Sequence, residues 1–100
     1  MRTAAIRLSD EVVREFCERH HIRRLALFGS ALRDDFRPDS DLDIVVEFEP
    51  DYVPGLGFFG IEEELSRLFG RKVDLNTPGF LSPYIRDQVL EEAEVLYDAA

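Results

Sequence analysis

Apolar residues recur every three to four positions in three stretches of the chain, a spacing typical of amphipathic helices. The first predicted helix follows Ser9, a good N-cap, and runs to about His20. The second covers residues 58–69 and ends at Gly70. The third begins with Ser82 and Pro83 at the N-cap and first helical position. Its expected buried stripe is Ile85, Val89, Leu90 and Ala93.

Short apolar runs between these stretches predict strands at residues 23–28, 41–48 and 72–76, with a short closing strand at 95–97. The segment "SALRDD" after the first strand is expected to open a further short helix, and "TPGFL" to be a loop. The resulting order, α-β-α-β-α-β-α, predicts an α+β fold in which helices pack on a small mixed sheet of three to four strands. One hundred residues suit a single domain, residues 1–100.

Side chains alternate between the two faces of a strand, and this alternation separates apolar from acidic positions in the second predicted strand. The inward set is Leu42, Ile44, Val46 and Phe48, and the outward set is Asp41, Asp43, Val45 and Glu47. Asp41 and Asp43 would then lie about 6.6 Å apart at Cα. The third strand repeats the pattern, with Lys72, Asp74 and Asn76 outward. If the two strands are neighbours, Asp74 joins the two acids on one surface.

The simplest interpretation of these carboxylates is a solvated acidic face, which would usually be right for a lone Asp-x-Asp in a strand. Three converging carboxylates repel one another, however, and a bound cation relieves that repulsion. All-oxygen ligands suit Mg²⁺ or Mn²⁺ rather than zinc. Cys17, His20 and His21 are expected to have structural roles, since the cysteine is on an apolar stripe and the histidines are adjacent at a helix end.

Gly29 and Ser30 lie where the first predicted strand ends and a helix begins. Glycine allows close approach of the backbone to a ligand, and a serine at a helix start offers a hydroxyl and free N–H groups, a combination that binds phosphate. Taken alone, the pair is better explained as a tight turn with Ser30 as an N-cap. The segment is not a Walker A loop, because the Gly-Lys-Ser/Thr ending is missing.

The formal net charge of −9 argues against nucleic-acid binding, which requires a basic surface. It is compatible with a basic protein partner or with a site that gathers cations. The N-terminal stretch has no apolar run long enough for a signal peptide, and no segment reaches membrane-spanning length. We therefore expect a soluble cytoplasmic protein that does not bind membranes.

The joint pattern is more specific than its parts. Gly29-Ser30, then ten residues, then Asp41-x-Asp43, with Asp74 on a later strand, resembles the nucleotidyltransferase superfamily that includes DNA polymerase beta. The short length and the ending "SPYIRDQVLEEAEVLYD" are similar to its minimal nucleotidyltransferases. The resemblance implies a polymerase beta-like fold and a site that binds ATP together with two Mg²⁺ ions, with Mn²⁺ as an alternative.

The resemblance also implies individual roles. Gly29 and Ser30 would hold the β- and γ-phosphates, and Asp41 and Asp43 would bind both metal ions. Asp74 would complete the metal site beside the attacking hydroxyl and is a candidate for accepting its proton.

Arg33 matches an arginine often found in this family's loop. It could contact phosphate, or it could pair with Asp34 or Asp35. Many relatives have glycine at the position of Asp34, so the path of this loop can differ here.

Minimal members of the family resemble antitoxins that pair with helical HEPN-domain ribonucleases. The implied reaction transfers AMP from ATP to a tyrosine of the toxin and releases pyrophosphate. The loop at residues 52–60 is a candidate docking surface, although at least one of Phe58 and Phe59 is expected to be ordinary core. Two alternatives stay open: a non-enzymatic antitoxin that acts by binding, and a nucleotidyltransferase for a small molecule such as an aminoglycoside.

Overall fold

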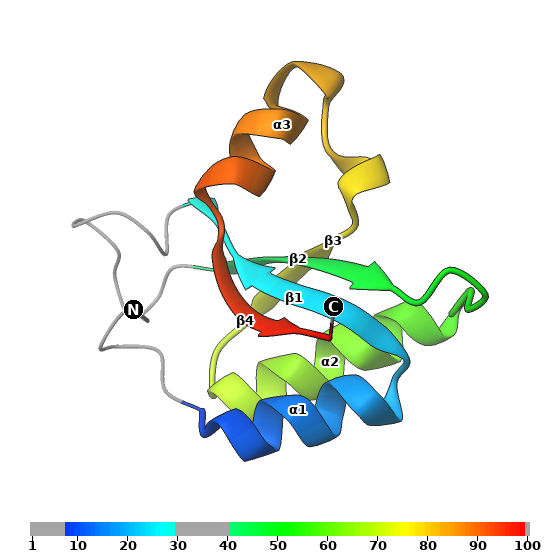
Figure 1. Cartoon of the computed structure of the whole chain (residues 1–100). Helices are drawn as coiled ribbons and strands as arrows, with labels where there is room; N and C mark the ends of the chain where they lie inside the picture. Colours follow the sequence, from blue (N-terminus) through cyan, green and yellow to red (C-terminus); the bar gives the residue numbers. More distant parts are fainter. Residues whose placement is uncertain (1–7, 30–40, 100) are drawn as a thin grey trace.

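A four-stranded mixed sheet separates two layers of helices in the computed structural model, which describes residues 8–29 and 41–99 (Figure 1). The elements in chain order are α1 (Asp10–Arg19), β1 (Ile22–Leu27), β2 (Leu42–Phe48), α2 (Gly57–Phe69), β3 (Val73–Asn76), the 3₁₀-helix η2 (Pro78–Phe80), α3 (Pro83–Glu92) and β4 (Glu94–Asp98). The strand order is β3-β2-β1-β4. β1 is antiparallel to β2 and to β4, whereas β2 and β3 are parallel. The predicted α+β architecture is therefore confirmed.

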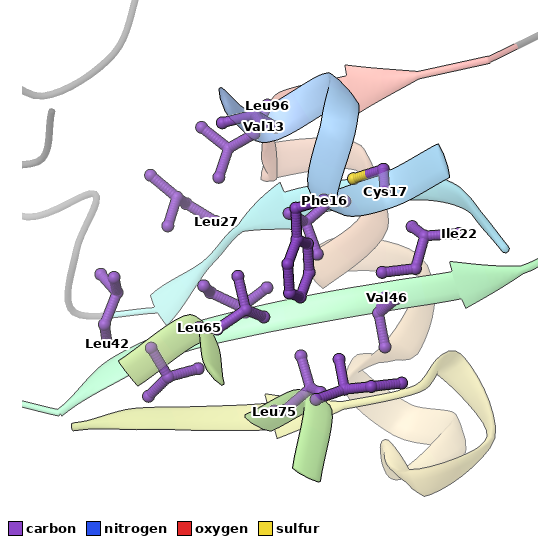
Figure 2. Packing of buried hydrophobic residues seen from close by; sticks show 14 of the residues in the cluster. Val13, Phe16, Cys17, Ile22, Leu27, Leu42, Val46, Leu65, Leu75 and Leu96 are labelled. Atoms are coloured by element: carbon purple, nitrogen blue, oxygen red, sulfur yellow. The ribbon is translucent and has the colours of Figure 1, made fainter. Parts of the chain in front are cut away.

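The main core lies between the sheet and the layer formed by α1 and α2 (Figure 1). Phe16 and Cys17 of α1, Leu65 of α2 and inward residues of the strands meet there (Figure 2). The four inward positions predicted for β2 all belong to this cluster, with Phe48 at its margin. Burial raises the pKa of the Cys17 thiol to about 12, so this cysteine stays protonated and acts as a small core residue, as expected.

The opposite face of the sheet is covered in part by η2 and α3, which corrects two sequence-based expectations (Figure 1). Val45, predicted on the outward acidic face, is only 3 % exposed because it packs with Ala26 and Leu81 in a second, smaller cluster. Ile85, predicted to be buried, is 46 % exposed, because the first turn of α3 stands away from the sheet. The later part of the predicted stripe does pack on this cluster, through Val89, Leu90 and Ala93.

The ends of the helices follow the predicted capping chemistry. The Ser9 hydroxyl accepts a hydrogen bond from the Val12 N–H at 3.2 Å, and Ser82 caps α3 in the same way. Gly70 ends α2 with φ of 70°, as expected for a C-terminal glycine. The expected loop at 77–81 instead contains η2, because Pro78 suits the first position and the Phe80 N–H bonds to the Thr77 carbonyl. The helix predicted at residues 30–35 lies outside the described residues.

The outer edge of β3 is covered by two side chains from α2. The Val73 N–H donates to the Ser66 hydroxyl at 2.9 Å, and the Leu75 N–H donates to Oε2 of Glu62 at 2.8 Å. The Ser66 hydroxyl in turn donates to the Glu62 carbonyl. Alternate N–H groups of this edge strand are thus satisfied within the chain, which anchors β3 against α2. None of the helices in the described part of the chain is both long and apolar enough to cross a bilayer.

Glu64 ties α2 to the end of α1, where Arg19 donates to it at 2.7 Å and His20 lies 3.0 Å from its other oxygen. The hydrogen bond from Arg19 is the main reason why the pKa of Glu64 falls below its usual value. Because the folded-state pKa is the lower one, the stabilisation is complete above the pKa of an unfolded glutamate, about 4.3, and disappears as the pH falls through the lowered folded pKa.

Glu64→Gln should therefore lower the free energy of unfolding at neutral pH by less than about 1 kcal/mol, since the pair is partly exposed. The difference from wild type should vanish in acid, which urea unfolding at two pH values would measure. Glu63→Gln is the matched control, because Glu63 contacts Arg67 only within the exposed surface of the same helix. A loss that persists unchanged in acid would contradict this assignment.

Candidate active site

The end of β1 brings Gly29 against Asp43. The Phe28 N–H donates to the Asp43 carbonyl at 3.0 Å, which extends the pairing of β1 with β2 up to the glycine. Gly29 has φ of +69°, and a Cβ atom built there would lie 2.5 Å from Oδ2 of Asp43. Glycine is required for both reasons, since the conformation is left-handed and the carboxylate occupies the place of a side chain. The phosphate-loop glycine predicted from the sequence therefore adjoins a predicted metal ligand.

Asp43 and Asp74 are neighbours on adjacent parallel strands. They are register partners in the β2–β3 pairing, so their side chains leave the same face of the sheet, with strands about 4.8 Å apart. Asp41 immediately precedes β2, and the Leu42 N–H after it donates to the Lys72 carbonyl at 2.9 Å. The sequence analysis predicted this grouping only if the strands that carry Asp43 and Asp74 are neighbours. The structure confirms that β2 and β3 are neighbours, and the three acids lie at one end of the sheet.

The carboxylates differ in their surroundings. Asp43 is half-buried, whereas Asp41 and Asp74 are exposed. Nζ of Lys72 lies 3.8 Å from Oδ2 of Asp41 at the solvent-exposed rim. Sequence reasoning assigned Lys72 only to the outward face. Its position two residues before Asp74 was the available signal that it would stand beside the acids.

The donor set has the chemistry of a hard-cation site, because it consists of carboxylate oxygens only. Within residues 8–29 and 41–99, no three His, Cys, Asp or Glu side chains are already gathered closely enough to hold a metal ion. Like charges favour such separation, and the Lys72 ammonium offsets part of the repulsion. The absence of a side chain at Gly29 lets the backbone at the end of β1 lie directly against the Asp43 carboxylate.

Other predicted residues fall elsewhere. Ser30, Arg33 and Asp34 lie outside the described residues, so their roles stay predictions. His20 packs on Phe16 and contacts Glu64, in keeping with the structural role expected for it. His21 adopts a φ of 57° in the turn between α1 and β1 and stacks on Tyr52, at the far end of β2 from the three acids.

Comparison with known proteins shows the family to which this chain belongs. The nucleotidyltransferase domain model matches residues 9–96. The chain therefore belongs to the nucleotidyltransferase domain family. The protein adenylyltransferase MntA of Thermococcus cleftensis is 40 % identical over 80 residues, which cover 79 % of each chain.

Solved structures share the fold. A protein assigned as a minimal nucleotidyltransferase is 39 % identical and superposes with a TM-score of 0.69, covering 84 % of this chain and 85 % of that one. A toxin–antitoxin structure with AMP-PNP gives a TM-score of 0.71 at 20 % identity, over 91 % and 74 % of the two chains. A complex of tri-AMPylated Shewanella oneidensis HEPN toxin with its MNT antitoxin gives 0.62 at 19 % identity, over 89 % and 69 %. These matches confirm the predicted minimal nucleotidyltransferase fold.

Proposed function

We propose that this chain is a protein adenylyltransferase that moves AMP from ATP to a tyrosine of a HEPN-domain toxin and thereby acts as its antitoxin. The observation that carries the proposal is the pairing of Asp43 with Asp74 across parallel strands, with Gly29 pressed against the Asp43 carboxylate. The relative named MntA and the tri-AMPylated toxin complex support the identity of the transferred group and of the partner.

The reaction exchanges the phosphoanhydride bond between the α- and β-phosphates of ATP for a phosphodiester bond to the toxin. The tyrosine oxygen forms a bond to the α-phosphorus of ATP while the bond from that phosphorus to the bridging oxygen of the β-phosphate breaks, and pyrophosphate leaves. The tyrosine proton must be removed, because its ordinary pKa is about 10. Asp74 is exposed beside Asp43 and is the described carboxylate that we assign to accept this proton at a side-chain oxygen.

Asp41, Asp43 and Asp74 would hold the divalent metal, Mg²⁺ or Mn²⁺, of which the family resemblance implies two ions. When bound, such ions stabilise negative charge on the triphosphate and on the departing pyrophosphate. Gly29 contributes by letting the backbone at the start of the proposed phosphate loop lie directly against the Asp43 carboxylate. Ser30 and Arg33 are proposed to contact the phosphates from the following loop. We further propose that the chain works as one domain in the cytoplasm, where ATP is available.

The deciding experiment is incubation of the chain with a purified HEPN-domain toxin encoded beside its gene, ATP and Mg²⁺, followed by intact mass measurement of the toxin. We expect the toxin to gain one or more AMP units, to lose its ribonuclease activity, and to stay unmodified when EDTA is present. A tight complex that silences the toxin with no change of mass would instead support the non-enzymatic antitoxin.

A further inference from the structure

Six aromatic rings form one connected cluster at the end of the sheet where β2 finishes. The stacking begins with His21 on Tyr52 at 4.4 Å between centroids, and Tyr52 lies 5.8 Å from Phe48. Phe58 then contacts three further rings, namely Phe48 at 6.5 Å, Phe80 at 5.7 Å and Phe59 at 6.0 Å. These ring contacts hold the end of β2, the start of α2 and η2 together, so exposed side chains on these elements have fixed positions.

The loop between β2 and α2, the start of α2 and η2 carry four exposed apolar side chains, which we call the apolar surface. Its members are Val53, Leu56, Phe59 and Phe80, which are 84 %, 87 %, 65 % and 67 % exposed. Phe58, which contacts Phe59 and Phe80, is buried with an exposure of 9 %, so the expectation that at least one of Phe58 and Phe59 is core is confirmed. Large apolar side chains gathered in this way on a small domain are typical of an interaction site. Three of the four lie within seven consecutive residues.

The segment that carries the apolar surface is acidic. Residues 49–67 contain five carboxylates and one guanidinium, that of Arg67. Glu62 and Glu64 are used inside the fold, by β3 and by α1. Glu49, Asp51 and Glu63 remain on the exposed part of the segment, where Glu49 lies near His21 and Glu63 pairs with Arg67. A partner that complements this surface presents apolar side chains flanked by lysine or arginine.

We propose that the apolar surface is the docking site for the HEPN toxin, which would present a helix face of apolar and basic residues to it. The inference rests on the proposed function and adds the place of contact. The surface and the carboxylates lie at opposite ends of β2 (Figure 1). A strand of seven residues spans about 20 Å, so docking leaves the three acids open to ATP and to the acceptor tyrosine. Binding of the toxin and transfer of AMP are thus carried by separate regions of the chain.

The double variant Leu56→Asp/Phe59→Asp tests this separation. Both side chains are exposed, and an acidic residue is favourable at the N-terminus of α2 that they occupy. We expect KM and Kd for the toxin to rise at least tenfold, kcat at saturating toxin to stay within twofold, and the rise in melting temperature caused by ATP with Mg²⁺ to be unchanged. Val12→Asp is the matched control, since Val12 is a partly exposed apolar residue in the first turn of α1.

The outcomes separate the two proposals. A wild-type chain that binds the toxin without modifying it, and that the double variant no longer binds, would keep the docking site and overturn the proposed chemistry. Modification by both proteins with equal KM and Kd would overturn the docking site alone. A wild-type chain that self-associates through this surface, shown by a monomeric variant with unchanged Kd for the toxin, would make a second copy the occupant and would also overturn it.

Discussion

Asp43→Asn is expected to lower the rate of AMP transfer by about a thousandfold or more, while the protein stays folded. Asparagine has the shape of aspartate but lacks the charge that a divalent cation requires, and loss of one such group in a preorganised site commonly costs this much. Asp43 faces away from the main core and lies beside Asp74, so repulsion between the two carboxylates falls in the variant. The melting temperature should therefore be unchanged or slightly higher.

Initial rates from intact mass measurement of the toxin, together with circular dichroism of the variant, would check this expectation. Asp87→Asn is the matched control, because Asp87 is an exposed carboxylate on α3, outside both the proposed site and the apolar surface. Asp41→Asn should resemble Asp43→Asn in activity. A purified Asp43→Asn protein with the wild-type rate would show that the site has been assigned to the wrong residues.

Gly29→Ala is expected both to destabilise the fold and to reduce transfer about a hundredfold. A side chain at φ of +69° costs about 1–2 kcal/mol on conformational grounds alone. The added Cβ would also displace the Asp43 carboxylate, because Oδ2 of Asp43 lies only 2.5 Å from the position that this Cβ would take. Small displacements of catalytic groups are expensive, since reacting atoms must be aligned closely.

Gly70→Ala separates these two effects. Gly70 has a similar φ of +70°, but its Cβ would meet no atom of the described residues within 4 Å. Both variants should therefore lose similar stability from backbone strain, measured by urea unfolding, and only Gly29→Ala should lose transfer. Equal activities in the two variants would mean that the contact between Gly29 and Asp43 does not position the site.

The local pattern of the sequence was sufficient to predict that Asp43 and Asp74 face away from the main core. Alternation within residues 41–48 separates Asp43 from the core, and the structure agrees because that core face is fully apolar. The partnership of Asp43 with Asp74 could not be derived in the same way. It depends on the parallel crossover through α2, which brings β3 beside β2, and on the register of two strands far apart in sequence.

The errors have a common physical cause. Val45 and Ile85 were assigned from the period of their own elements, whereas their burial depends on where α3 sits over the second face. α3 covers only a small cluster and has no fully buried residue, so its periodicity was a weak guide. Lys72 was passed over for a related reason, because a lysine on a solvated strand face is ordinary until its neighbour across the sheet is known.

The side chains of α2 that cover the edge of β3 also affect strand pairing, both with other polypeptides and within the sheet. A strand edge with unpaired N–H groups invites another polypeptide to add to the sheet, and it also allows the strand to slip by one residue. A slip of that size would turn Asp74 into the core and Leu75 onto the outward face, where Asp43 lies. By fixing the Val73 and Leu75 N–H groups, Ser66 and Glu62 hold β3 in the one alignment that keeps a carboxylate opposite Asp43. The same two side chains thus protect the sheet edge from pairing with another chain and keep Asp74 beside Asp43.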